Sequence, residues 1–520
     1  MHMLQRLATS VECPHFTPRV TARTAAASPE KALAMVAVLL PWLAWLLVSL
    51  LSIYVLDLLI HSRRGLPPGP RPLPLIGNLH LLGKQPHRTL ARLAKTHGPL
   101  MSLRLGAVTT VVVSSPDAAR EFLQKHDAAF ASRSVPDATG EHAKNSVPWL
   151  PNGPRWRALR RTMAAELFAP HRLDALRDVR REKVRELVDH VGRLARGGAA
   201  VDVGQVAFTT GLNLLSRMIF SRDLITGFDC RGESKEIMEV AGMANVSDFF
   251  PAVAAVDLQG ARRRMARLFS RLHRVFDVEI AQRLRGRDAS EPRKNDFLDV
   301  LLDNSKAGID RDTLLSLFTD LYAAGMNNIS NTMEWVMSEL LQNPLVMSKA
   351  CDELSRVIGE RRNIEESEIS KLPHLQAVVK ETFRLHPPAP LLLPRQADTT
   401  TTVMGYTIPK GARVHVNIWA MGRDENIWPE PEKFMPERFL DRAVDIRGGD
   451  FELIPFGSGR RICPGMTLAI RMVHSVLASL LNQYKWSLPD EVQRNGIDMS
   501  EKFGVNVTKV VPLCAIATPI

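Results

Sequence analysis

The most informative stretch of the sequence is Phe456-Gly457-Ser458-Gly459-Arg460-Arg461-Ile462-Cys463-Pro464-Gly465. Its cysteine stands among three glycines and two arginines, whereas a lone cysteine is most often a small buried hydrophobic residue. Glycines allow positive φ angles and the close approach of a flat ligand. Backbone N–H groups and arginines lower the pKa of a thiol, and a helix predicted from Leu468 onward adds its positive dipole end. The segment therefore predicts a thiolate that can bind a metal ion.

The other cysteines do not form a recognisable set. The five cysteines of the 520-residue chain are widely scattered, at Cys13, Cys230, Cys351, Cys463 and Cys514. No pair has the spacing of a zinc site, and a disulfide framework is not expected.

Hydrophobic residues make up 45% of the chain and charged residues 23%, as in a globular protein with a sizeable core.

The cysteine segment resembles the signature of the haem-thiolate monooxygenases, the cytochromes P-450, which is Phe-x-x-Gly-x-Arg-x-Cys-x-Gly. The matching residues are Phe456, Gly459, Arg461, Cys463 and Gly465. The resemblance implies a mainly α fold with a small β region, the cytochrome P-450 fold. It also implies haem b as cofactor, with Cys463 as iron ligand and Arg461 as partner of a propionate. A thiolate ligand favours O–O cleavage.

Two further motifs occur in the order that the resemblance implies. Glu381 and Arg384 stand three residues apart on one helical face, and Arg438 follows in Pro436-Glu437-Arg438-Phe439. In the family such a group is structural, because a planar guanidinium holds a buried carboxylate at two points. Trp156 and Arg160, one helical turn apart, and Arg395 are expected to contact the haem propionates.

The distal motif departs from the family pattern. The family carries a glycine, an acid and an alcohol on its long central helix, whereas this chain has Ala324-Gly325-Met326-Asn327-Asn328. Asn327 replaces the acid and Asn328 the alcohol, and an amide does not titrate near neutral pH. Thr332 lies one turn beyond Asn328 on the same face. Proton delivery through water held by Asn327, Asn328 and Thr332 is the hypothesis.

Three functions are compatible with this departure. The preferred one is a monooxygenase that hydroxylates a small lipophilic substrate with dioxygen and electrons from an NADPH-dependent reductase. The second is a haem-thiolate isomerase or dehydratase that does not need dioxygen. The third is a catalytically impaired haem-binding protein. Turnover that needs no NADPH would exclude the first function.

Periodicity predicts mostly helices between Arg155 and Pro390. The expected helices include Arg177–Arg196, Leu314–Leu341 and Leu375–Leu385. Strands are expected on both sides of Gly106, at Leu100–Leu105 and Thr109–Val113, and again at Val403–Ile408 and Ala412–Asn417.

The N-terminal region predicts a membrane anchor. The run from Ala32 to Leu56 has no charged side chain and is long enough to cross a ~30 Å hydrocarbon core. A buried core helix and a cleaved signal peptide are the weaker alternatives. The expected organisation is a leader (1–31), a transmembrane anchor (32–60), a basic and Pro-rich linker (61–78) and a haem-binding catalytic domain (79–520). The leader is either a plastid transit peptide or the result of an upstream start that precedes Met35.

The net charge of +12 indicates an acidic partner or membrane face. No nucleic-acid-binding motif accompanies this charge, so nucleic acid is not expected. Between Arg155 and Arg185 lie ten basic and four acidic residues, which suit docking of NADPH-cytochrome P-450 reductase. The expected location is the endoplasmic reticulum membrane, with the catalytic domain in the cytosol.

The resemblance also implies which segments line the substrate pocket. Their apolar residues predict a lipophilic substrate; they are Val135, Val147, Trp149, Ala323, Ala324, Leu391, Leu392 and Val505. The phrases Glu166–Leu173 and Asp498–Gly504 resemble the plant geraniol-hydroxylase-like and cereal diterpenoid-hydroxylase-like members of the family. A terpenoid is therefore the expected substrate class, and a flavonoid is the alternative.

Overall fold

The computed structural model describes residues 29–62, 65–224, 230–303, 309–359 and 364–520, in two units, 1–60 and 61–520. The first unit contains α1 (Pro29–Ser62), whose stretch Ala37–Leu56 has a mean hydropathy of 2.2 and no buried share. This stretch is long and apolar enough to cross a membrane. Most of the predicted leader, residues 1–28, and the linker arginines Arg63 and Arg64 lie outside the described residues.

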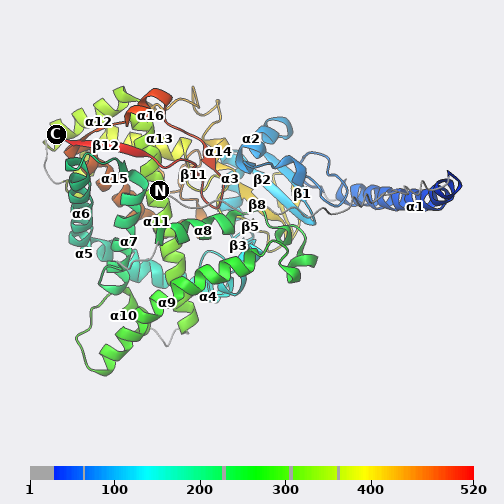
Figure 1. The fold of residues 1–520 in the computed structure, drawn as a ribbon, viewed down its shortest axis with the longest axis horizontal. Helices are drawn as coiled ribbons and strands as arrows, with labels where there is room; N and C mark the ends of the chain where they lie inside the picture. Colours follow the sequence, from blue (N-terminus) through cyan, green and yellow to red (C-terminus); the bar gives the residue numbers. More distant parts are fainter. Residues whose placement is uncertain (1–28, 63–64, 225–229, 304–308, 360–363) are drawn as a thin grey trace, which may run out of the picture. The chain divides into compact units, whose positions relative to one another are not determined.

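The larger unit is built around one long helix, α11 (Arg311–Gln342), which begins where the Asp310 carboxylate accepts a hydrogen bond from the Thr313 N–H. It ends before Asn343-Pro344, as the sequence predicts. Helices α7, α13 and α15 pack on it. In Figure 1 the five-stranded sheet lies to one side of α11, and α6, α12 and α15 lie to the other. The long helices are α6 (Arg177–Arg196), α7 (Val203–Phe220), α8 (Cys230–Gly242), α9 (Ala261–Asp288), α12 (Pro344–Val357), α13 (Pro373–Leu385) and α15 (Met466–Gln483).

An aromatic cluster joins three of these helices in the core. Phe220 of α7, Phe276 of α9, and Phe318 and Tyr322 of α11 lie with ring centroids 5.0–6.5 Å apart. The Tyr322 hydroxyl lies 2.8 Å from the Ser216 hydroxyl, so its polar end is also satisfied. Edge-to-face pairs of this kind contribute beyond the area that they bury. The cluster fixes α11 against α7 and α9.

A mixed sheet of five strands covers the other side of the unit, in the order β1-β2-β8-β5-β3. Strands β1 (Leu100–Leu105) and β2 (Val108–Val113) form the predicted antiparallel hairpin around Gly106. A side chain at Gly106 would lie 2.6 Å from the Phe249 carbonyl oxygen, and its φ is +60°. The other strands are β3 (Ser132–Arg133), β5 (Arg395–Gln396) and β8 (Arg413–Val416).

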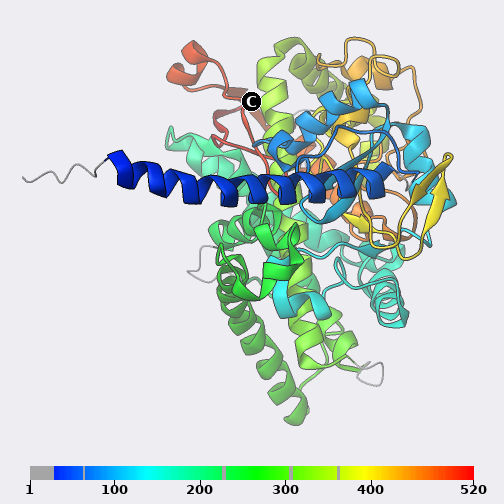
Figure 2. The same cartoon turned by 90° about the vertical axis from the view of Figure 1, so that its right-hand side faces the viewer.

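The segment Val403–Ile408 is not the single strand that the sequence analysis predicts. It belongs to a separate hairpin of β6 (Thr401–Val403) and β7 (Tyr406–Ile408), visible in yellow in Figure 2. Met404 and Gly405 both have positive φ, at 50° and 82°, which is the conformation of a two-residue hairpin turn. The chain therefore reverses where an extended strand was expected.

The C-terminal region forms two small sheets. One contains β4 (Val201–Asp202), β12 (Cys514–Pro519) and β9 (Tyr484–Ser487), and the other β10 (Glu501–Lys502) and β11 (Thr508–Lys509). The short helices are α2 (Pro86–His97), α3 (Pro116–Arg120), α4 (Pro154–Thr162), α5 (Pro170–Ala175), α10 (Phe297–Asp303), α14 (Ile418–Met421) and α16 (Asp490–Asn495). The predicted mainly α fold with a small β region is thus confirmed.

Candidate active site

The cysteine segment forms a tight loop that ends at the start of α15. The Cys463 N–H donates to the Phe456 carbonyl at 3.0 Å, and the Ile462 N–H donates to the Gly459 carbonyl at 3.0 Å. Gly459 has φ +70°, and a Cβ there would lie 2.0 Å from the Leu123 carbonyl oxygen, so only glycine fits. These contacts hold the half-buried Cys463 thiol in a fixed loop.

The half-buried Cys463 thiol lies next to groups that favour its thiolate. Burial raises the pKa of Cys463, whereas the backbone N–H groups of Gly465 and Met466 and the charge of Arg160 act to lower it. Arg160 also donates to the Ile462 carbonyl at 2.8 Å. The N-terminal end of α15 (Met466–Gln483) thus faces the sulfur, as the sequence analysis predicts.

Three predicted propionate contacts meet beside this loop. Arg461 donates to the carbonyls of Ala131, Val147 and Leu150, and its guanidinium lies 4.0 Å from the centroid of the Trp156 ring. Arg395 donates to the Ser458 carbonyl at 2.9 Å. The structure therefore brings Trp156, Arg395 and Arg461 to the cysteine loop.

A further arginine, Arg133, joins this group and was missed by the sequence analysis. It lies opposite Arg395 where β3 pairs with β5, and it donates to the Leu393 carbonyl at 2.6 Å. Nothing in the sequence around Arg133 marks it, since its place depends on the pairing of two strands far apart in the chain. Burial, together with the charges of Arg395 and Arg461, holds its pKa well below the usual range.

Nearby carboxylates do not balance the positive charge of Arg133, Arg395 and Arg461, which are called the arginine group below. Burial and the charge of Arg395 lower the pKa of Arg461 to about 9, and burial lowers that of Arg395 to about 10. Among the described residues, Asp127 is the carboxylate within 4 Å of these guanidinium groups, at 3.5 Å from Arg395. The buried Trp156 Nε1 and Arg133 Nε have no partner in the described part of the chain. Buried cations and unpaired donors are costly, so this site fits a ligand with two carboxylates, such as haem.

The central stretch of α11 contains the predicted distal residues. Between Thr313 and Leu341, Ala324 is the one exposed residue, with Ala323, Asn327 and Asn328 half-buried beside it. Asn327 donates to the Ser234 hydroxyl of α8 at 2.6 Å. Thr332 donates to the Asn328 carbonyl at 2.8 Å, so its hydroxyl proton is engaged by the helix itself.

The predicted pocket residues differ in burial. Val147, Trp149 and Leu391 are buried, whereas Ala323, Leu392 and Val505 are half-buried. Val135 is 42% exposed and lines an open cavity of about 620 Å³, whose lining contains none of the other seven predicted residues.

Asp320, on the same stretch of α11, has contacts that no sequence motif indicates. Its carboxylate accepts hydrogen bonds from the Ser146 hydroxyl at 2.7 Å and the Val147 N–H at 2.8 Å, and it lies 3.0 Å from His142 Nε2. Asp320 precedes Ala324 by one turn of α11. It therefore ties the segment that carries Ser146 and Val147 to α11.

Comparison with known proteins identifies the family. The cytochrome P450 family, here written P-450, matches residues 67–512. The chain is 48% identical to a geraniol 8-hydroxylase of Catharanthus roseus, over 91% of this chain and 98% of that protein. It is also 48% identical to a geraniol 8-hydroxylase of Swertia mussotii, over 89% and 96%. A geranylhydroquinone 3''-hydroxylase of Arnebia euchroma is 42% identical, over 91% and 98%.

The chain belongs to the cytochrome P-450 family. It is a haem-thiolate monooxygenase, and its relatives include the plant geraniol 8-hydroxylases. This confirms the resemblance inferred from Phe456–Gly465.

In this P-450, Glu381, Arg384 and Arg438 form a buried ion group. Arg384 Nε and Nη2 donate to the two Glu381 oxygens at 2.7 and 2.8 Å, and Arg438 Nε donates to Glu381 at 3.1 Å. Glu381 and Arg384 are fully buried. The remaining Arg384 donors contact the carbonyls of Gly422, Pro431 and Lys433, which joins α13 to the segment before the cysteine loop.

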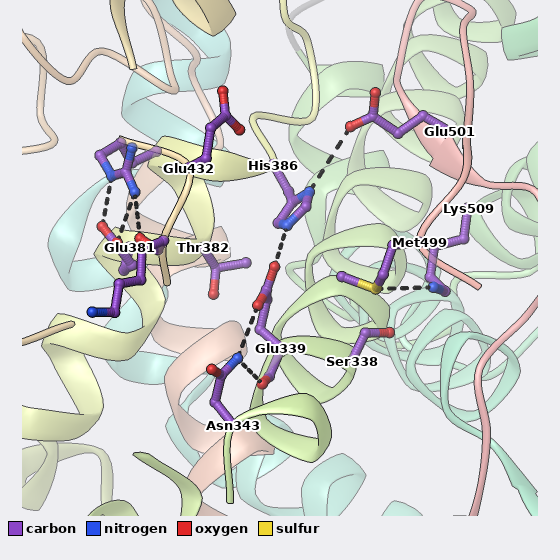
Figure 3. Close-up of polar contacts among 12 residues, drawn as sticks. Ser338, Glu339, Asn343, Glu381, Thr382, His386, Glu432, Met499, Glu501 and Lys509 are labelled. Carbon is purple, nitrogen blue, oxygen red and sulfur yellow. Dashed lines mark hydrogen bonds and ion pairs between the residues drawn. The ribbon is translucent and has the colours of Figure 1, made fainter. Parts of the chain in front are cut away.

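A second buried polar network anchors the hairpin of β10 and β11. Figure 3 shows Glu501, His386 and Glu339 in a line, with His386 Nε2 2.6 Å from Glu339 and Nδ1 4.0 Å from Glu501. Arg88 donates to Glu501 at 2.7 Å. Burial acts to raise the pKa of Glu501, but hydrogen bonds from His87 and Arg88 outweigh it and lower the pKa to about 2. The network joins α2, α11 and the hairpin.

Proposed function

We propose that this P-450 hydroxylates a small lipophilic terpenoid, with dioxygen and electrons from NADPH-cytochrome P-450 reductase. The observation that carries this proposal is the 48% identity to two geraniol 8-hydroxylases over nearly their whole length. The apolar predicted pocket residues, such as Val147, Ala324 and Leu391, support the same substrate class. A flavonoid remains the alternative substrate.

In this proposal the chain holds haem b through its thiolate and its arginine group. When bound, the haem iron supplies the activation of dioxygen, which thiolate ligation favours. Cys463 is the iron ligand, and Phe456, Gly459 and Gly465 shape its loop. Arg461, Arg395, Arg160 and Trp156 would hold the propionates, together with Arg133. The ion group of Glu381, Arg384 and Arg438 is structural, because it fixes the chain that leads into the loop.

The electron donor would dock on the basic surface beside the cysteine loop. Helix α4 (Pro154–Thr162) turns Trp156 inward and exposes Arg157 and Arg161. Exposed cations on this helix suit an acidic flavin domain and would accelerate its association at low salt. With α1 as a membrane anchor, the catalytic domain would lie on the cytosolic face of the endoplasmic reticulum.

Substrate-induced spectral shifts test the proposed substrate class. Full-length enzyme in detergent is titrated with a monoterpene alcohol, a diterpene and a flavonoid of similar solubility. A terpenoid is expected to displace water from the haem and produce the high-spin shift at the lowest concentration. A flavonoid that binds more tightly than both terpenoids would contradict the proposal.

The amides at 327 and 328 are expected to support oxygen activation with water as the proton carrier. Their side chains donate to Ser234 and Ala324, and neither amide can supply a titrating proton. The double change Asn327→Asp with Asn328→Thr restores the acid and alcohol. General acid–base groups contribute roughly 100-fold or more in many enzymes, so we expect at least severalfold more product per NADPH consumed.

The ratio of hydrogen peroxide to product measures this coupling. Ser330→Ala is the matched control, because its hydroxyl donates to the Gly204 carbonyl and faces away from the predicted distal side. If the double variant releases as much hydrogen peroxide per product as the parent, this would count against a monooxygenase that delivers protons through water held by Asn327 and Asn328. Product formation without NADPH would instead favour the isomerase or dehydratase.

A further inference from the structure

A pair of side-chain amides joins the turn between β10 and β11 (residues 503–507, the C-terminal turn) to the predicted distal stretch of α11. Asn506 Nδ2 donates to Asn328 Oδ1 at 2.7 Å. Asn328 Nδ2 donates in turn to the Ala324 carbonyl at 2.8 Å, and Ala324 is the exposed residue of this stretch. Asn506 is buried, with 5% of its surface exposed. The Asn328 amide is therefore fixed through both its oxygen and its nitrogen.

The turn that presents Asn506 is itself held at several points. Asn331 Nδ2 donates to the Val507 carbonyl at 2.5 Å, and the Val507 N–H donates to the Pro388 carbonyl at 2.9 Å. Phe503 stacks on the His87 ring with centroids 5.4 Å apart. The Glu501 network fixes the strand that leads into the turn. Asn506 thus donates from a rigid position.

We propose that Asn506 is a positioning residue that orients the Asn328 amide as a hydrogen-bond donor toward the distal haem side. An amide has two nearly isosteric orientations, one with oxygen and one with nitrogen on a given side. Because Asn506 donates and the Ala324 carbonyl accepts, the two contacts together select the orientation in which Asn328 turns its oxygen toward the turn and its NH₂ group toward Ala324. One of the two N–H bonds of this group is used by the Ala324 carbonyl, which leaves the second for a ligand.

This assignment rests on the proposed haem site, but it requires no particular substrate. It explains how a chain without the family's alcohol keeps a fixed donor at that place. It also gives the C-terminal turn a role in the site, because Asn506 of the turn and Asn328 of α11 together set the direction of one hydrogen-bond donor.

The carbon–oxygen stretching frequency of the ferrous carbon monoxide complex tests the assignment without substrate or reductase. A hydrogen-bond donor near the bound ligand lowers this frequency. Asn328→Leu should therefore raise it. Asn506→Leu should raise it by part of the same amount, because the contact of Asn328 with the Ala324 carbonyl is kept. Asn506→Asp, which replaces the donor by an acceptor, should have the full effect of Asn328→Leu. The double variant Asn328→Leu with Asn506→Leu should equal Asn328→Leu alone.

The matched control is Ser330→Ala, which removes a side-chain hydrogen bond of the same stretch of α11, to the Gly204 carbonyl, and touches neither Asn328 nor the turn. It should leave the frequency at the parent value. The assignment is overturned if Asn328→Leu has no effect, if Asn506→Leu leaves the frequency unchanged, or if Ser330→Ala shifts it as much as Asn506→Leu. A chain that hydroxylates no terpenoid can still give the expected shifts, so this result is separate from the proposed substrate.

Discussion

Cys463→Ala is expected to abolish the long-wavelength absorption band of the reduced carbon monoxide complex, together with all hydroxylase activity. The band depends on thiolate ligation, and Cys463 lies in the loop that carries the motif Phe456–Gly465 beside the arginine group. The chain should still fold, because the loop is held by backbone contacts such as that between the Cys463 N–H and the Phe456 carbonyl, which alanine keeps.

Cys351→Ala is the matched control for this experiment. Cys351 lies on α12, is half-buried, and has a pKa raised by burial and by Asp352. Its replacement should leave the absorption band and the activity at the parent level. A Cys463→Ala enzyme that retained the band would contradict the assignment of the iron ligand.

Glu381→Gln is expected to reduce the free energy of unfolding by about 3–5 kcal/mol, which is the typical cost of leaving buried charges unpaired. Arg384 and Arg438 both donate to Glu381, and the Met435 N–H donates to it at 2.8 Å. The change should therefore disrupt the segment before the cysteine loop and lower the amount of haem retained after purification. Urea titration followed by tryptophan fluorescence measures the loss.

Glu430→Gln provides the surface comparison. Glu430 pairs with Lys433 at 3.2 Å, and both side chains are more than half exposed. Exposed pairs contribute about 0–1 kcal/mol, so this variant should be close to the parent. The structural role of the buried ion group would be refuted by a Glu381→Gln enzyme as stable, and as rich in haem, as Glu430→Gln.

Local sequence patterns were sufficient for the helices and for the cysteine loop. The charged periodicity of Arg177–Arg196 and the Asn343-Pro344 stop of α11 depend on neighbouring residues alone, and the structure agrees with both. The loop before Cys463 needs glycine at 459 because a side chain there would clash with the Leu123 carbonyl, and this glycine is one of the motif residues.

Long-range pairings could not be read in the same way. Arg133 joins the arginine group only because β3 pairs with β5, more than 200 residues apart. Asp320 and Asn506 have ordinary polar side chains, and their partners are 174 and 178 residues away. The Met404-Gly405 turn was missed because Met seldom adopts positive φ, so the segment resembled a continuous strand.

The proposed function requires this chain to insert oxygen from dioxygen into a terpenoid through a Cys463-ligated haem. To test this, isotopically labelled dioxygen is supplied to full-length enzyme with reductase, NADPH and a monoterpene alcohol, and the label is determined in the product. We predict one labelled oxygen atom per new hydroxyl group and no product when NADPH is omitted. A product that forms without NADPH, or whose new oxygen is unlabelled, would contradict it.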